Sequence, residues 1–226
     1  MTEVVLDAVH VRHGDREVLR GVTLRLTERR VAVIGANGSG KSTLARLLNG
    51  LVVPTSGRVL VDGLDTRRRG REVRRRVGFV FTDPDAQIIM PTVAEDVAYS
   101  LRRSGLSKAE VGTRVAAELH RHGLADHADH PAHLLSGGQK QLLALTSVLV
   151  TAPRLVVADE PTTLLDLRNT RAVADRLAGL DQHVVLVTHD LDLVAGYDRV
   201  LVVDGGRVVV DDVPAAAVPA YRRLMA

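Results

Sequence analysis

The stretch that decides the fold is GANGSGKS, residues 35–42, which directly follows the apolar run VAVI at 31–34. It matches the pattern G-x-x-x-x-G-K-[ST] and stands between an expected strand and an expected helix, the setting that a phosphate-binding loop requires. Its glycines let backbone amides converge on phosphate oxygens, Lys41 neutralises phosphate charge, and the Ser42 hydroxyl reaches a magnesium ion. A plain glycine-rich turn is the alternative, and the full match disfavours it. The residues expected to contact a nucleotide here are Gly35, Asn37, Gly38, Ser39, Gly40, Lys41, Ser42 and Thr43.

The composition limits the other possibilities. At 226 residues and 46% hydrophobic content, the chain suffices for one large domain with a buried core. Aromatic residues make up only 2% and the net charge is +3, so nothing in the composition argues for a nucleic-acid partner. The absence of cysteine excludes disulfides and thiolate chemistry and is compatible with a reducing cytoplasm. The apolar run LLALTSVLV at 142–150 is far short of the roughly 20 residues that span a bilayer.

The pattern along the chain predicts an α/β fold. Strands are expected at 3–11, 17–26, 31–35, 57–63, 77–81, 155–159 and 183–189, followed by a hairpin at 200–210 around Gly205-Gly206. A helix is expected from Ser42, with Leu44, Leu47, Leu48 and Leu51 on one face and Gly50 near its end. The arginine-rich stretch at 66–76 is interpreted as a solvated helix or loop.

Polar groups end two of the expected strands. Asp159 and Glu160 close LVVAD-E, and His189 closes HVVLVTH. An acidic pair at the end of a strand often has no function beyond stabilising the start of the next helix, and a single histidine there is often structural. Beside a phosphate-binding loop, however, Asp159 fits a magnesium ligand and Glu160 fits the group that orients or deprotonates the attacking water. Ligands of open α/β sheets collect at the carboxyl ends of the strands, where Gly35, Asp159 and His189 are all expected.

The stretch LLSGGQKQL, residues 134–142, has two interpretations. Ser136 and Gln139 have the spacing of a helix capping box, which satisfies free amides at a helix start. The glycines between them also leave amides exposed at the positive end of the helix, where an anion binds.

Together, GANGSGKST, LSGGQ, DEPTTLLD and THD, in this order, resemble the nucleotide-binding subunit of ABC transporters over about residues 3–212. The resemblance implies a P-loop NTPase (RecA-like) core with a parallel central sheet and antiparallel β edge strands. Residues 1–226 are then one domain, with the catalytic core at about 1–81 and 154–226 and an inserted helical subdomain at about 82–153.

The resemblance also implies an ATP- and Mg²⁺-dependent ATPase in which two subunits pack head to tail. Ser136, Gly137 and Gly138 would then contact the ATP of the facing subunit, with Gln139 mainly as the capping partner. Asp166 would lie in the loop that crosses the interface, and His189 would contact the γ-phosphate. The catalytic residues that the resemblance implies are Glu160, His189 and Lys41. Ser42 and Asp159 would bind the magnesium ion.

The chain departs from the family pattern in two places. His13 stands where the family has an aromatic residue that stacks on adenine, so either weak stacking or a plain turn residue is expected there. Thr82 stands where the family has a glutamine that touches magnesium and senses the membrane partner, and Gln87 follows five residues later. Either Thr82 or Gln87 can take that role.

The stretch FTDPDAQIIMPTVAEDVAYSL at 81–101 most resembles the ATPases of energy-coupling factor importers, and among them the biotin-transport members. This implies a peripheral subunit at the cytoplasmic face of the membrane that powers import of biotin, another vitamin or a transition-metal ion. Its partners would be a second ABC ATPase, identical or paralogous, and integral coupling and substrate-binding subunits, with no nucleic acid. The alternative is a soluble ABC-type ATPase of DNA maintenance or translation control, which the single phosphate-binding loop disfavours. A histidine cluster at His120, His122, His127, His130 and His133 is interpreted as solvated surface rather than a metal or pH sensor.

Overall fold

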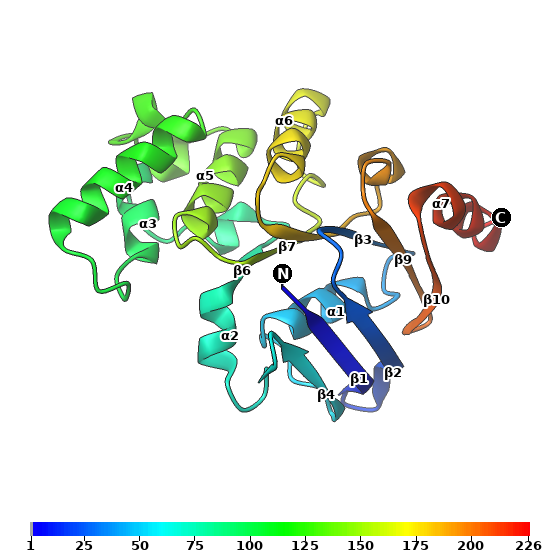
Figure 1. Cartoon of the computed structure of the whole chain (residues 1–226). Helices are drawn as coiled ribbons and strands as arrows, with labels where there is room; N and C mark the ends of the chain where they lie inside the picture. The colour runs from blue at the N-terminus through cyan, green and yellow to red at the C-terminus, as the bar shows by residue number, and fades with distance from the viewer. Residues whose placement is uncertain (1) are drawn as a thin grey trace.

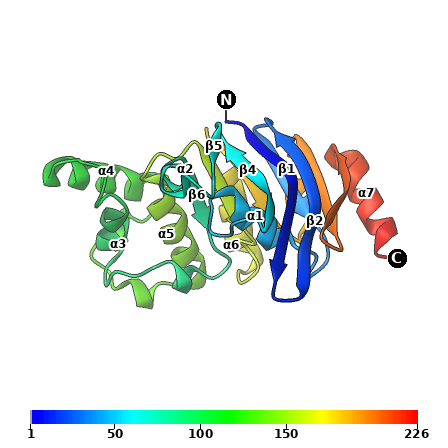
Figure 2. The same ribbon diagram turned by 90° about the horizontal axis from the view of Figure 1, so that it is seen from below.

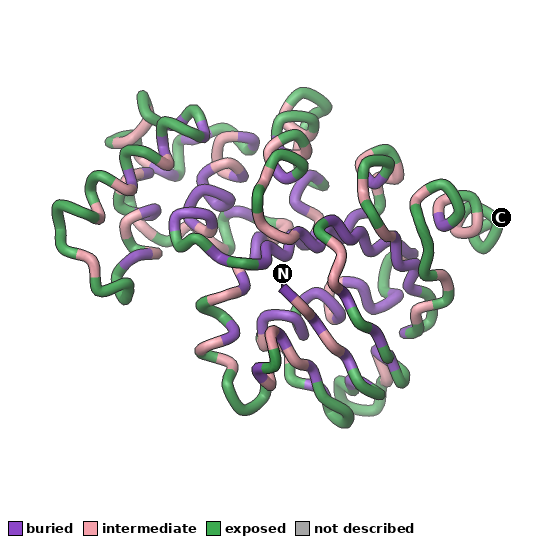
Figure 3. The backbone as a smooth tube through the Cα atoms, in the orientation of Figure 1, coloured by how far each residue is buried: buried purple, intermediate pink, exposed green. Residues whose placement is uncertain are grey.

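The computed structural model describes residues 2–226, and its centre is a six-stranded sheet (Figure 1). The strand order is β10-β9-β3-β8-β7-β6, in which the five strands from β9 to β6 are parallel and β10 pairs antiparallel with β9. The six strands are β3 (Arg30–Ile34), β6 (Val77–Val80), β7 (Leu155–Asp159), β8 (His183–Val187), β9 (Arg199–Asp204) and β10 (Arg207–Asp212). β3 and β7 are buried along their whole length (Figure 3), which is why both are apolar except for Arg30 at the start of β3 and Asp159 at the end of β7.

The remaining strands form a separate antiparallel sheet of order β2-β1-β4-β5. They are β1 (Val4–His13), β2 (Arg16–Leu26), β4 (Ser56–Val61) and β5 (Leu64–Asp65). The antiparallel strands are therefore divided between this sheet and the β10 edge of the central one. Helix α1 (Lys41–Leu48) lies between the two sheets (Figure 2), and its Leu44, Leu47 and Leu48 share one hydrophobic core with both.

Helix α1 is shorter than its apolar pattern predicts. Gly50 lies in the left-handed region at φ +70° and turns the chain, so that the Leu51 amide donates back to the Arg46 carbonyl at 3.0 Å. This is the hydrogen bond of a Schellman motif, which ends helices at glycine. The expected helix end near Gly50 is thus correct, but the expectation that Leu51 extends the buried face is wrong, because its side chain is exposed.

Between β6 and β7 the chain is helical and has its own hydrophobic cluster, which includes Val97, Leu119 and Leu143. This part lies to the left of the central sheet in Figure 1. It contains α3 (Val93–Ser100), α4 (Lys108–Arg121), α5 (Gly137–Leu149) and the 3₁₀ turns η1 (Pro84–Ala86), η2 (Ala125–His127) and η3 (Ala132–Leu134). Each of the three α-helices begins with a complete capping box, so the sequence itself fixes where they start.

Four further helical segments complete the fold: α2 (Gly70–Arg76), α6 (Leu167–Ala178), the 3₁₀ turn η4 (Leu191–Val194) and α7 (Pro214–Leu224). In α2 only Val73 is buried, as expected for a solvated arginine-rich segment. The sequence reading ended at the β9–β10 hairpin and did not anticipate α7, which packs against β9 and β10 at the far edge (Figure 1). Within residues 2–226, none of the helices has the length and apolar character needed to cross a bilayer.

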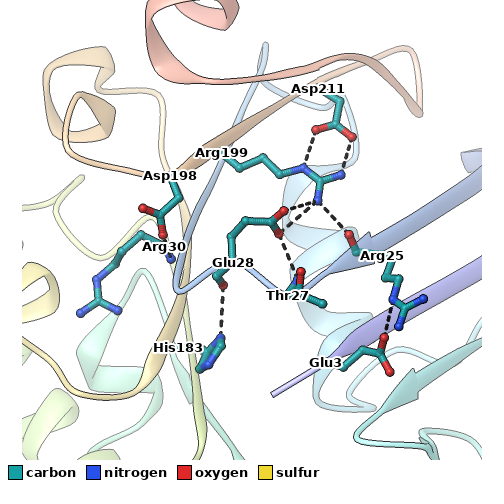
Figure 4. A network of polar contacts seen from close by, with 9 residues as sticks. All are labelled: Glu3, Arg25, Thr27, Glu28, Arg30, His183, Asp198, Arg199 and Asp211. Atoms are coloured by element: carbon teal, nitrogen blue, oxygen red, sulfur yellow. Dashed lines mark hydrogen bonds and ion pairs between the residues drawn. The ribbon is translucent and has the colours of Figure 1, made fainter. Parts of the chain in front are cut away.

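An arginine on β9 ties the two sheets together (Figure 4). Arg199 donates to both carboxylate oxygens of Asp211 at 2.6 Å and to those of Glu28 at 3.0 and 3.1 Å. A further bond at 2.8 Å reaches the backbone carbonyl of Arg25 on β2. The hydrogen bond to Asp211 is the largest cause that raises the pKa of Arg199, so this guanidinium is charged throughout the accessible pH range.

Candidate active site

The carboxyl ends of the central strands meet around one cavity of about 460 Å³. β3 contributes the start of the glycine-rich loop, β6 leads to Thr82, β7 leads to Glu160, and β8 leads to His189. The lining residues are Gly35, Ala36, Asn37, Thr82, Glu160, Thr163, His189 and Tyr221. Residues from distant parts of the sequence therefore share one site because parallel strands end at the same edge.

The glycine-rich loop wraps around its own lysine. The Lys41 ammonium donates to the carbonyls of Gly35 at 2.8 Å and Ala36 at 3.0 Å. Burial lowers the pKa of Lys41, while the nearby carboxylates of Glu160 and Asp159 act in the opposite direction. A desolvated ammonium gains most from an anion that enters the loop, because Coulomb attraction strengthens as water is excluded.

Backbone geometry makes glycine necessary at the start of this loop. Gly35 has φ +151°, and a Cβ there would stand 2.1 Å from the carbonyl oxygen of Val203 on β9. At the other end, α1 begins at Lys41 without a side-chain cap. The first amides of a helix have no intrahelical acceptor, so the start of α1 offers N–H donors to an anion.

Asp159 is buried beside Ser42. The Ser42 hydroxyl donates to Asp159 Oδ1 at 2.8 Å, Arg46 Nη2 lies 3.6 Å from Oδ2, and the side chain is 1% exposed. Desolvation raises the pKa of Asp159, opposed first by the Ser42 hydrogen bond and then by Arg46. Within residues 2–226 no cluster of three or more His, Cys, Asp or Glu residues has the geometry of a metal site. A carboxylate beside a serine hydroxyl nevertheless fits Mg²⁺, which is usually bound by one or two carboxylates together with substrate phosphates.

We expect Asp159→Asn to stabilise the nucleotide-free protein at pH 7. An aspartate whose folded-state pKa is raised loses stability as pH rises from its unfolded pKa through the folded value, so the full cost is present at neutral pH. Asparagine removes this cost and can still accept from Ser42. The melting temperature should rise, at about 2–4 °C per kcal/mol for a chain of this size. The gain over wild type should shrink as pH falls from the raised folded-state pKa toward about 4, the ordinary pKa of aspartate, and should be absent below that. A lower melting temperature for the variant at pH 7 would refute this interpretation.

Glu160 and His189 are in direct contact. His189 Nδ1 lies 2.7 Å from Glu160 Oε2, which also accepts from the Thr163 hydroxyl at 3.1 Å and the His189 amide at 3.3 Å. Glu160 has φ +51°, a conformation that costs a non-glycine residue energy and that concentrates at functional sites. The Glu160 side chain is 14% exposed and that of His189 is 56% exposed. Because the three contacts converge on Oε2, Oε1 is the oxygen left for a water in the cavity.

The structure separates Thr82 from Gln87. Thr82 lines the cavity, and its hydroxyl donates to the backbone carbonyl of Asp159 at 2.7 Å. Gln87 accepts from the Phe81 amide at 3.3 Å and donates to the Ala144 carbonyl at 2.8 Å, so its amide joins the segment after β6 to α5. Of the two, Thr82 has the position from which an oxygen can reach a nucleotide or its metal ion.

The LSGGQ residues begin α5 and lie outside the cavity of their own chain. Ser136 and Gln139 form the expected capping box, with bonds of 2.9 and 3.3 Å. Gly138 packs directly against Asn169 of α6, because a Cβ at Gly138 would stand 2.2 Å from Asn169 Oδ1. Asp166 caps α6 through the Asn169 amide at 2.8 Å, so the LSGGQ tip rests on the helix that follows the Asp166 loop.

A second cavity, of about 470 Å³, lies between the β1–β2 hairpin and the glycine-rich loop. Arg12 and Arg16 line it together with Gly38, and Arg16 donates to the Gly38 carbonyl at 3.4 Å. His13 is exposed at the hairpin tip and is not among the lining residues. Sequence reasoning missed both arginines, although the basic residues around the turn in RHGDR were a visible signal. It also missed Tyr221, for which no motif exists.

The histidine cluster is not all solvated surface. His122 is buried at the end of α4, 3.4 Å from both Glu118 Oε2 and Arg176 Nη1, and burial is the main cause that lowers its pKa. His127 is half-buried and contacts Gln139. The solvated interpretation is wrong for these two residues, because η2 folds back over the start of α5 and α6 covers the end of α4. His120, His130 and His133 are exposed.

The geometry agrees with comparisons to known proteins. Residues 19–163 match the family model described as ABC transporter. The biotin transport ATP-binding protein BioM of Rhizobium etli is 47% identical over 99% of this chain and 99% of its own length. The chain therefore belongs to the ABC transporter family. It is the ATP-binding subunit of an ABC transporter and an ATPase.

Two solved structures share the fold. The structure of cbiO1 from Clostridium perfringens, described as part of the ABC transporter complex cbiONQ, has a TM-score of 0.85 and 33% identity, covering 98% of this chain and 92% of that chain. The ATP-binding cassette MJ0796, a dimer in a post-hydrolysis state bound to ADP and Pi, has a TM-score of 0.81 and 29% identity, covering 93% of this chain and 98% of that one. The expected P-loop NTPase fold is thereby confirmed, and its central sheet is mixed, because β10 joins the five parallel strands in the antiparallel direction.

Proposed function

We propose that this chain is the energy-coupling ATPase of an energy-coupling factor importer at the cytoplasmic face of the membrane, and that the imported solute is biotin. The observation that carries the proposal is the full-length similarity to a biotin transport ATPase, combined with a cavity lined by Glu160, His189 and the start of the loop that encloses Lys41. A transition-metal ion is the other solute that named relatives support, since one is a cobalt import ATP-binding protein.

In this proposal the chain binds ATP through the 35–43 loop. The amides at the start of α1 and the Lys41 ammonium hold the phosphates, and Ser42 and Asp159 hold Mg²⁺, with the Thr82 hydroxyl near them. Mg²⁺ held by these residues would supply charge neutralisation at the phosphates. Glu160 accepts the proton of the attacking water at Oε1, while Thr163 and His189 fix its other oxygen. The exposed edge of the His189 ring contacts the γ-phosphate. Catalysis of phosphoryl transfer then consists of positioning and charge stabilisation.

A second ABC ATPase subunit completes each site. Leu164 and Leu167 flank the Asp166 loop, and they are 65% and 66% exposed. Large apolar side chains that are this exposed indicate a surface that binds another protein. The residues of the LSGGQ tip are not among those that line the cavity of their own chain. Head-to-tail pairing brings Ser136, Gly137 and Gly138 to the phosphates bound by the other subunit and covers the two leucines.

The membrane partner docks beside α3. A cavity of about 260 Å³ is lined by Asp85, Ile88, Ile89, Met90, Pro91, Ala132 and His133. Ile89 is 60% exposed, and the buried carboxylate of Asp96 holds the amides of Ile89 and Met90 at 2.9 and 3.2 Å. Only η1 separates this groove from Thr82, and Lys140 of α5 pairs with Asp85 at 2.7 Å. A partner helix in the groove can therefore move the segment that also borders the nucleotide.

The test is to tag the chain in its native host, solubilise the membranes in mild detergent and identify the proteins that co-purify. The proposal predicts an integral coupling subunit and a substrate-binding membrane subunit. Uptake of labelled biotin into cells expressing this set should depend on Lys41, while uptake of labelled cobalt by the same set would redirect the solute to a metal ion. Recovery in the soluble fraction together with nucleic-acid proteins would refute the importer.

A further inference from the structure

The amide of Gln139 lies between two groups that together fix its orientation. Its Oε1 accepts from the Ser136 backbone N–H at 2.9 Å, and its Nε2 lies 2.9 Å from Nε2 of His127. The other ring nitrogen of His127, Nδ1, is buried without a hydrogen-bond partner among residues 2–226. The hydrogen bonding of this ring is therefore directed at Gln139.

The donors and acceptors permit only one arrangement. A backbone N–H is always a donor, so the Gln139 oxygen must face Ser136 and the Gln139 amino group must face His127. The amino group is also a donor, so His127 Nε2 must be an unprotonated acceptor and Nδ1 carries the ring proton. If Gln139 turned over, its amino group would oppose the Ser136 N–H. The Ser136 N–H thus excludes the second orientation of the Gln139 side chain, and the His127 ring adds a second hydrogen bond that holds the first orientation.

This bond acts on the residue that meets the nucleotide of the facing subunit. Ser136 is joined to Gln139 twice, because the backbone N–H of Gln139 also donates to the Ser136 hydroxyl oxygen at 3.3 Å. That hydroxyl still has its own proton to donate. A fixed Gln139 therefore fixes both the backbone and the side chain of Ser136 at the end of α5.

We infer that His127 is a positioning residue for the LSGGQ tip, which it holds through the Gln139 amide in the orientation that receives ATP across the dimer. The inference rests on the proposed function, because it takes from it the contact between Ser136 and a γ-phosphate. His127 touches no nucleotide itself. His127 keeps the LSGGQ tip ordered before the two subunits close.

The experiment uses the complex purified from membranes through the tagged chain. His127→Phe keeps a ring but removes the acceptor, and His127→Gln returns an acceptor near the position of Nε2. Loss of one hydrogen bond of ordinary strength corresponds to a change of about three- to tenfold. We expect His127→Phe to lower kcat by about this factor with little change in KM, since ATP binds first to the unaltered loop at 35–43. His127→Gln should recover most of the loss, and ATP affinity of the isolated chain should match wild type.

The matched control is His130→Phe. His130 packs its ring edge-on against His127, with 5.8 Å between the ring centroids, and it is exposed. This variant should keep the wild-type kcat. In a Gln139→Ala background, His127→Phe should cause no further loss, because the bond it removes is already absent.

Four results would overturn the inference: a wild-type kcat for His127→Phe, an equal loss for His130→Phe, full additivity with Gln139→Ala, or no recovery of activity in His127→Gln. A failure of the proposed function looks different, since the wild-type complex would then lack membrane subunits or ATP hydrolysis. A destabilised tip without a positioning role would lower the melting temperature of both His127 variants and show no rescue by glutamine.

Discussion

A Glu160→Gln chain is expected to hydrolyse ATP at least about 10²–10³-fold more slowly than wild type, equivalent to about 3–4 kcal/mol of lost transition-state stabilisation. Glutamine has the size of glutamate and can still accept from Thr163 and His189 at one oxygen. It cannot take a proton from water at the position of Oε1. ATP should therefore bind but remain uncleaved, and the two subunits should stay closed over it.

The measurement is steady-state phosphate release by the purified chain, together with size-exclusion chromatography with and without ATP. The variant should elute as a dimer only with ATP. Glu95→Gln makes the same chemical change at the third position of α3, where glutamine also serves the capping box, and it should leave turnover unchanged. Hydrolysis by Glu160→Gln at the wild-type rate would remove Glu160 from its proposed role.

Gly138→Ala should reduce ATP turnover by about 10²-fold or more, an effect comparable to the loss of an oxyanion donor. The new Cβ would stand 2.2 Å from Asn169 Oδ1 and 2.3 Å from Asn169 Cγ. Asn169 cannot easily move away, because its backbone N–H and its side-chain amide donate to the Asp166 carboxylate at 2.8 and 2.9 Å. The start of α5 must therefore move away from α6 and carry the LSGGQ amides with it.

Gly137 provides the matched comparison for folding. A Cβ at Gly137 would meet only Leu165 Cδ2, at 3.9 Å, so Gly137→Ala should keep the wild-type melting temperature while Gly138→Ala lowers it. Shortening the obstructing side chain in Gly138→Ala/Asn169→Ala should restore part of the activity. If Gly138→Ala is as active as wild type, the packing of the tip on α6 does not control its position.

The features that the sequence predicted are those that depend on neighbouring residues. VAVI before GANGSGKS defines a buried strand, a loop and a helix within a dozen positions, and Ser136 and Gln139 define a capping box within four. The end of α1 is also local, yet the apolar spacing of Leu51 competed with Gly50, and the left-handed turn at Gly50 decided the outcome.

The features that the sequence could not predict depend on contacts between distant segments. The Gln87 side-chain amide joins Phe81 to Ala144, a residue 57 positions away, and no local pattern shows this contact. His122 is buried because α6 supplies Arg176 from 54 positions away, and Tyr221 reaches the cavity only through the packing of α7 on β9. No local pattern records such contacts.

The central claim is that ATP is hydrolysed in sites that two subunits build together, with the 35–43 loop from one and the LSGGQ tip from the other. The most direct measurement is the ATPase activity of a mixture of Lys41→Ala and Gly138→Ala chains that carry different tags. Each variant alone should be nearly inactive. Mixing should restore hydrolysis well above the sum of the two, because a mixed dimer contains one site with an intact loop and an intact tip. If double-tag purification recovers mixed dimers and their activity stays at the sum of the separate variants, the loop and the tip act within one chain and the account is contradicted.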